Sequence, residues 1–263
     1  LISAVNIALP TIERDFSLSA IELSWIITSF ILGTALFMLP AGTWGDRNDN
    51  RRLFQWGLLL FTLSSLLCYF APDGYWLIAG RFVQGAGAAF TGTTGQAILV
   101  ATFPATRRGQ VLGISVSSVY AGLALGPLAG GILTIHTGWR SLFLIATIFG
   151  LFTTLISLRY MRKNEEKARP AGKGDHIGTI LFMAGLSALV YGSSRIPSLP
   201  GWAMMGGALL MLLLFLRVER NALHPLLDIR LFTHNRLFTY SSLSALINYT
   251  ATFAIVFFLS LYL

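Results

Sequence analysis

Charged residues are scarce in this sequence. Asp, Glu, Lys and Arg make up 11% of the 263 residues, whereas 54% are hydrophobic. The mean hydropathy is +0.68. Because a water-soluble domain carries roughly 25% charged residues, this composition excludes that class and indicates that most of the chain lies in lipid. We therefore expect an all-α polytopic membrane protein.

Cysteine is almost absent. Cys68 is the single cysteine and lies inside an apolar run, so no disulfide can form within the chain. The four histidines have neither cysteine companions nor partners four residues away, which argues against a metal site. The sequence also contains no nucleophile and base pairing and no phosphate-binding loop. We expect no enzyme activity, no cofactor and no bound metal.

Acidic residues are missing from the interior of the apolar runs. Between Leu23 and Leu263 no Asp or Glu lies deep within a run. A proton carrier needs a group inside the membrane that gains and loses a proton, and carboxylates commonly fill this role. A proton-coupled protein built on this chain would need its acid in the first helix or in a second half of a longer protein.

Long apolar runs are what the sequence does contain. Most have about the length that a helix needs to cross a bilayer. We expect nine helices, of which the first and the last are incomplete. The runs are Leu1-Thr11, Leu23-Gly42, Leu53-Ala71, Tyr75-Val100, Val111-Ile135, Ser141-Leu158, Ile177-Ser193, Trp202-Leu216 and Leu237-Leu263.

Basic residues follow the loops. Of the nineteen Lys and Arg residues, fifteen lie in the alternate segments 43–53, 101–110, 159–176 and 217–236, and only three lie in the opposite loops. Loops rich in Lys and Arg stay in the cytoplasm. The bias therefore predicts a cell-membrane protein whose N-terminus is cytoplasmic. It also explains the net charge of +8 without a nucleic-acid partner.

Three glycines spaced four residues apart lie in one apolar run, at Gly122, Gly126 and Gly130. On a helix they share one face, which forms a bare groove where a second helix can approach closely. Pro127 lacks an amide hydrogen, so the helix is expected to bend there. Two interpretations follow: a hinge and seal between two bundles, or an ordinary contact between small residues.

Arg81 stands inside the apolar run LIAGRFVQGAGAAF. Burying this charge in a bilayer costs ~2.5 kcal/mol or far more, so it is a candidate functional residue. The alternative is that the side chain reaches the outer membrane surface, which Tyr75 and Trp76 mark.

The loop GTWGDRNDNRRLF joins two runs by a short turn that places two acidic residues and three arginines together. Positive-inside topology explains the arginines but not Asp46, which stands at the end of a run. Asp46 is expected either to cap a helix N-terminus or to pair with arginines of a neighbouring loop.

These three stretches resemble the major facilitator superfamily. The short loop resembles the superfamily's G-x-L-[AG]-D-R-x-G-R-[RK] signature, with Asp49 at the usual second glycine. The run around Arg81 resembles R-x-x-Q-G-x-G, and GLALGPLAGG resembles the G-x-x-x-G-P-x-x-G-G signature of exporters. The resemblance implies coupling or gating roles for Asp46, Arg47, Arg51, Arg81 and Gln84. It implies hinge or packing roles for Gly42, Gly45, Gly85, Gly87, Gly122, Gly126, Pro127, Gly130 and Gly131.

The later chain resembles the fourteen-helix drug:proton antiporter family, in which two extra helices separate the halves and a P-L-[LI]-D-[LI]-R-L-F segment precedes the second half. Pro225 opens that segment here, and we expect an interfacial stretch. VNIALPTI resembles the family's first helix, with Leu1 where an aspartate usually stands.

The resemblance implies three parts: an N-terminal bundle at 1–160, a loop and two linker helices at 161–220, and an interfacial segment with the first helix of a second bundle at 221–263. It implies alternating-access efflux of lipophilic or cationic compounds against protons. The expected partners are the small-molecule substrate, protons and the lipid bilayer, and a periplasmic adaptor stays open. The other hypothesis is a transport-inactive sensor or assembly subunit on the same scaffold.

Overall fold

The computed structural model describes residues 1–47, 49–161, 175–222 and 225–262, with side chains up to Ala251. Every regular element in these ranges is an α-helix, which confirms the all-α expectation. The helices are α1 (Ile2–Phe16), α2 (Ala20–Arg47), α3 (Asn50–Tyr69), α4 (Gly74–Thr102), α5 (Ala105–Thr137), α6 (Arg140–Tyr160), α7 (His176–Ser193), α8 (Leu199–Asn221), α9 (Arg230–His234) and α10 (Arg236–Tyr262).

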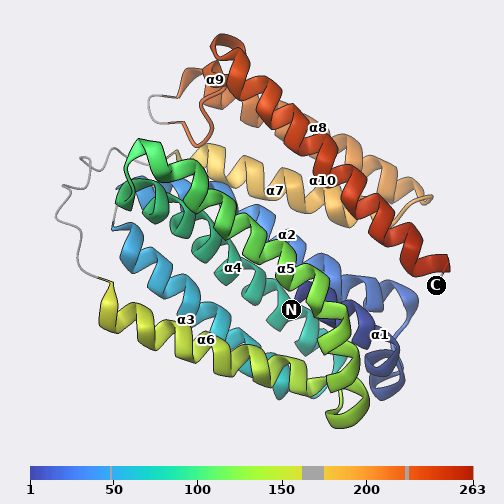
Figure 1. The fold of residues 1–263 in the computed structure, drawn as a ribbon. Coiled ribbons are helices and arrows are strands. Elements are labelled where there is room, and N and C mark those ends of the chain that lie inside the picture. Colours follow the sequence, from blue (N-terminus) through green and yellow to red (C-terminus); the bar gives the residue numbers. More distant parts are fainter. Residues whose placement is uncertain (48, 162–174, 223–224, 263) are drawn as a thin grey trace.

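The first six helices form one bundle in which successive long helices run in opposite directions (Figure 1). Helix α4 packs against both α2 and α3, while α6 packs against α3 and α5 against α1. This places α4 at the centre of the packing and leaves α5 with Gly130 as its single buried residue. The central helix carries the fully buried side chains of Arg81 and Gln84.

Helices α7 and α8 form a pair with each other. Gly185 and Gly192 of α7 face α8, since an added Cβ would lie 3.0 Å from Leu212 Cγ and 3.1 Å from Met204 Cβ. The pair meets the first bundle through α2, where the rings of Trp25 and Tyr191 have their centroids 5.9 Å apart. Two helices thus follow the six-helix bundle in the chain and lie against it.

Among the described residues, six helices are long and apolar enough to cross a membrane: α2, α3, α5, α6, α7 and α8. This supports a multi-pass membrane protein. Helix α4 is 29 residues long but is absent from this set, because its glycines, threonines and Arg81 lower its hydropathy. Its neighbours α2 and α3 cover it instead of lipid.

The structure corrects one boundary among the expected helices. The first helix extends to Phe16 rather than Thr11, and it ends at Ser17, whose φ of 53° is left-handed. The nine expected helices correspond to α1–α8 and α10 in the described chain. The short helix α9 lies within the segment after Pro225, whose interfacial position stays a prediction.

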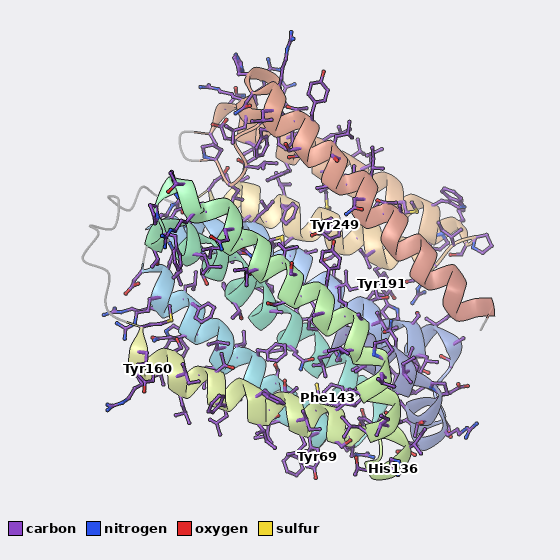
Figure 2. The ribbon with its side chains drawn as sticks, in the orientation of Figure 1. Tyr69, His136, Phe143, Tyr160, Tyr191 and Tyr249 are labelled. Carbon is purple, nitrogen blue, oxygen red and sulfur yellow. The ribbon has the colours of Figure 1, made fainter. Side chains whose placement is uncertain are left out.

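The two ends of the bundle differ in their connections. Figure 2 places Tyr160 at one end and Tyr69 and His136 at the other. The connections between α2 and α3 and between α4 and α5 lie at the end marked by Tyr160 (Figure 1). These are the basic loops, so the fold gathers them on one side.

Candidate functional site

Helices α2 and α4 touch backbone to backbone where two glycines meet the facing chain. A Cβ added at Gly85 of α4 would overlap the carbonyl oxygen of Phe30 in α2, and one at Gly33 of α2 would overlap the carbonyl oxygen of Phe82 in α4. Small residues allow helices in lipid to approach this closely. Gly33 and Gly85 therefore fix the distance between the two helices.

The other side of α4 meets α3 in the same way. A Cβ at Gly87 would lie 2.6 Å from the amide nitrogen of Phe61, and one at Gly57 would lie 2.7 Å from Phe90 Cβ. Distances below 3.0 Å to backbone leave no room for a side chain. Gly85 and Gly87 thus allow α4 to pack closely against both α2 and α3. This contact is compatible with the hinge or packing role that the resemblance implies for them.

Arg81 lies one turn before this contact and is fully buried, with 0% of its surface exposed. Its Nε donates a hydrogen bond to the carbonyl oxygen of Ile26 at 3.2 Å, and its guanidinium carbon stands 4.2 Å from the centre of the Phe30 ring. Both partners belong to α2. The alternative in which Arg81 reaches the outer membrane surface is therefore wrong, since the side chain turns into the protein.

A polar relay continues from Arg81 to α3. Arg81 Nη1 donates to Gln84 Oε1 at 2.6 Å, and Gln84 Nε2 donates to Ser65 Oγ at 2.6 Å. Gln84 and Ser65 are also fully buried. The chain of bonds links α2, α4 and α3 through side chains that have no access to water, where hydrogen bonds are electrostatically strong.

One nitrogen of this relay has no partner. Arg81 Nη2 is buried and forms no hydrogen bond within the part of the chain that the structure describes. A buried guanidinium nitrogen without an acceptor is costly, and both N–H groups of Nη2 remain available to donate hydrogen bonds.

The loop between α2 and α3 differs from the expectation for Asp46. Asp46 is exposed at the last turn of α2, and neither cap nor ion pair includes it among the described residues. Asp49 caps α3 instead, because its carboxylate accepts the amide of Arg51 at 3.0 Å. The capping role thus belongs to the residue that stands at the usual glycine.

The rest of this loop is held by close packing. A Cβ at Gly45 would overlap the amide oxygen of Asn50, whereas one at Gly42 would make an ordinary contact of 3.6 Å with Thr93 Cγ2. Arg51 Nε is buried without a hydrogen-bond partner in the described chain, and Arg47 is half-buried. The structure brings these residues together but assigns no pairing between Asp46 and Arg47 or Arg51.

The glycine groove of α5 meets α1 rather than a second bundle. A Cβ at Gly130 would lie 2.7 Å from Ala4 Cα, and one at Gly126 would overlap the Ser3 hydroxyl. These two glycines therefore make a close contact between small residues within the first bundle, and a role between two bundles stays a prediction. Gly122 has nothing within 4 Å, and Gly131 approaches Ile7 only at 3.8 Å. Helix α5 continues through Pro127, whose hinge role stays a prediction.

A matched pair of glycine variants tests whether this face of α5 packs against α1. Gly130→Val is expected to lower the melting temperature of the detergent-purified full-length protein, because overpacking against α1 costs about 1–3 kcal/mol. Gly122→Val is expected to leave it unchanged. Melting curves of both variants provide the measurement, and equal destabilisation would contradict the assignment of the contact to α1.

Comparison with known proteins connects this geometry to a family. The model of the Major Facilitator Superfamily matches residues 1–263. The chain belongs to the major facilitator superfamily. The motif-based resemblance is thereby confirmed, and with it the all-α major facilitator fold.

Relatives within the superfamily have transport names. The chain is 35% identical over 87% of its length to the multidrug resistance protein Stp of Mycobacterium tuberculosis, covering 43% of that protein. It is 30% identical over 99% of its length to the riboflavin transporter RibZ of Clostridioides difficile, covering 57%. It is 34% identical over 88% to the cephamycin export protein CmcT of Amycolatopsis lactamdurans, covering 49%. The chain spans about half the length of these relatives.

Sequence reasoning missed four residues of the site: Gly33, Gly57, Ser65 and Asp49. The first two have no glycine four residues away and lie outside the motifs of the resemblance, so neither signal could find them. Ser65 stands in an apolar run, where a hydroxyl needs a partner, and this was a usable signal. Asp49 directly precedes a helical run, which is the ordinary position of an N-cap.

Proposed function

We propose that the chain forms the first transport bundle and the two linker helices of a secondary transporter that exports lipophilic or cationic compounds in exchange for protons. In this proposal, residues 1–160 form the first bundle. Residues 161–220 form the loop and the two linker helices, and residues 221–263 form the start of a second bundle. Substrate would bind near the midplane between the bundles, which rock to give alternating access. The names of Stp and CmcT support export, whereas RibZ is named only as a transporter.

The buried Arg81 relay is the observation that carries this proposal. A permanently charged side chain with 0% exposure has no purely structural use in an apolar bundle, because an apolar residue would pack there at lower cost. Its free Nη2 offers a donor to an acid that is charged in one state and protonated in the other. Arg81 and Gln84 therefore act in coupling, while the glycines hold the helices that carry them.

The proposed orientation puts the N-terminus and the end of the bundle marked by Tyr160 in the cytoplasm. In a Cys68→Ser background, Tyr160→Cys is expected to resist a membrane-impermeant maleimide in intact cells, whereas His136→Cys at the opposite end reacts. Both side chains are exposed, so access to the reagent decides the result. Rapid labelling of Tyr160→Cys alone would reverse the orientation.

Efflux of a fluorescent lipophilic cation tests the export activity. Cells that express the full-length protein are loaded with the dye, energised and followed by fluorescence, with vector-only cells as the control. We expect faster loss of dye than in the control, abolished by a protonophore. No difference across a panel of cationic and neutral dyes would support the sensor or assembly subunit instead.

A further inference from the structure

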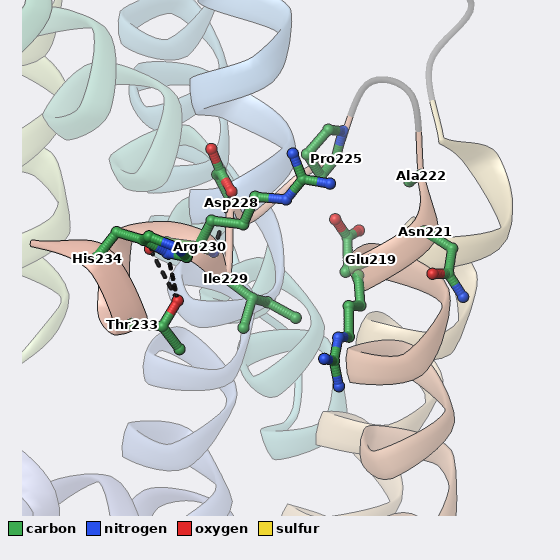
Figure 3. Close-up of a pocket in the computed structure, with 10 residues that line it drawn as sticks. Glu219, Asn221, Ala222, Pro225, Asp228, Ile229, Arg230, Thr233 and His234 are labelled. Carbon is green, nitrogen blue, oxygen red and sulfur yellow. Dashed lines mark hydrogen bonds between the residues drawn. The ribbon is translucent and has the colours of Figure 1, made fainter.

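A pocket of about 650 Å³ lies where α8 ends and the chain turns into α9. Figure 3 shows Glu219 and Asn221 on one side of it and Asp228, Arg230, Thr233 and His234 on the other. This volume lies within the range of small-molecule sites. No proposed coupling residue lines it.

The walls of the pocket are held by their own hydrogen bonds. Glu219 is 2% exposed, and its Oε2 accepts the amide of Leu227 at 3.3 Å. Asp228 Oδ1 accepts the amide of Arg230 at 3.0 Å, and Thr233 donates to the carbonyl oxygen of Arg230 at 3.1 Å. Hydrogen bonds thus fix the described walls on the α9 side, and Glu219 contributes one of them, while its Oε1 is buried without a partner in the described chain.

Two cations remain free at this pocket. Arg220 and Arg230 line it and are exposed, and within the described part of the chain their guanidinium groups form no ion pair and no hydrogen bond. Asp228 is the one exposed carboxylate among the described lining residues, and the other carboxylate of the lining, Glu219, is only 2% exposed. The exposed charged groups of the lining therefore include two arginines against one aspartate.

An apolar groove of about 500 Å³ runs along α8 beside this pocket. Arg220 and Ile229 line both hollows, so the groove and the pocket are continuous. Leu210, Leu213 and Leu214 line the groove and are 64%, 53% and 52% exposed. Arg217 stands at the same end as Arg220. A hollow lined by arginines thus lies directly beside an exposed apolar groove.

We propose that the pocket and the groove together bind one anionic glycerophospholipid, with its phosphate on Arg220 and Arg230 and an acyl chain along the leucines of α8. Guanidinium groups match phosphate with paired hydrogen bonds, and basic pockets at membrane-facing helix ends recognise anionic headgroups. A free phosphate compound would use the arginines but leave the groove empty. The lipid uses both.

Native mass spectrometry of the full-length protein in detergent tests the site with two lipids of equal chain length, phosphatidylglycerol and phosphatidylcholine. We expect one phosphatidylglycerol to bind at least about tenfold more tightly than phosphatidylcholine. The double variant Arg220→Gln with Arg230→Gln is expected to bind phosphatidylglycerol more weakly, with the affinity falling by roughly tenfold for each arginine removed. The control removes the same charge elsewhere, by Arg107→Gln with Arg108→Gln at the exposed start of α5, and keeps the preference.

Two further arms make the outcome decisive. The double variant Leu213→Asn with Leu214→Asn is expected to bind phosphatidylglycerol more weakly although both arginines remain. Excess glycerol 3-phosphate is expected not to displace phosphatidylglycerol from the parent protein. Equal binding of both lipids, parent-like binding by the arginine variant, or displacement by glycerol 3-phosphate would each overturn the proposal. The readout does not use transport, so its failure and the failure of the proposed function are distinguishable.

Discussion

Replacing Arg81 by alanine is expected to reduce proton exchange driven by substrate to the background of empty liposomes, while the protein stays inserted and folded. The guanidinium joins α2, α4 and α3 through Ile26, Gln84 and Ser65 and holds a free donor on Nη2. Its loss leaves Gln84 without one partner, which costs about 1–3 kcal/mol. Its loss also removes a buried charge, which offsets part of that cost.

The measurement is the pH change inside proteoliposomes after substrate is added, for the full-length parent and variants. Arg81→Lys keeps the charge but loses the planar group that reaches two partners, and it is expected to recover little exchange. Arg140→Ala is the matched control, because Arg140 is a half-buried arginine that pairs with Asp15 at 3.2 Å at a helix end. Unchanged exchange in Arg81→Ala would show that the relay only packs.

Gly85→Val is expected to be strongly destabilising. Its side chain would overlap the carbonyl oxygen of Phe30, which belongs to the backbone of α2 and cannot rotate away. We expect a loss at or above the upper end of the ~1–3 kcal/mol that overpacking usually costs. The variant would therefore accumulate poorly and melt earlier in detergent.

Gly92→Val is the control on the same helix. It carries the same change in helix propensity, but nothing lies within 4 Å of its added Cβ. Size-exclusion profiles and melting curves compare the two variants with the parent. A Gly85→Val protein that melts like Gly92→Val would contradict the backbone contact between α2 and α4.

Patterns along the chain predicted the elements well because apolar length and helix identity are local properties. The run around Tyr75-Val100 became α4, and the regular spacing of Gly126 and Gly130 predicted a close helix contact. The partner of that contact was not local. Which helix lies against α5 depends on the packing of the whole bundle. Local sequence patterns do not specify that partner.

The same distinction applies to the charged residues. Arg81 and Gln84 are three residues apart on one helix, so their hydrogen bond follows from spacing. The continuation to Ser65 crosses to another helix, and only the packed structure shows it. Asp46 illustrates the reverse case, because its motif position suggested a cap while the turn geometry gives that role to Asp49.

Direct observation of coupled exchange tests the central claim. The full-length protein is reconstituted into liposomes, a pH gradient is imposed, and the movement of a lipophilic cation and of protons is recorded together. The account predicts that the cation moves only with a gradient and that protons move in the opposite direction. Cation movement that ignores the gradient, or no movement of either species, would contradict it.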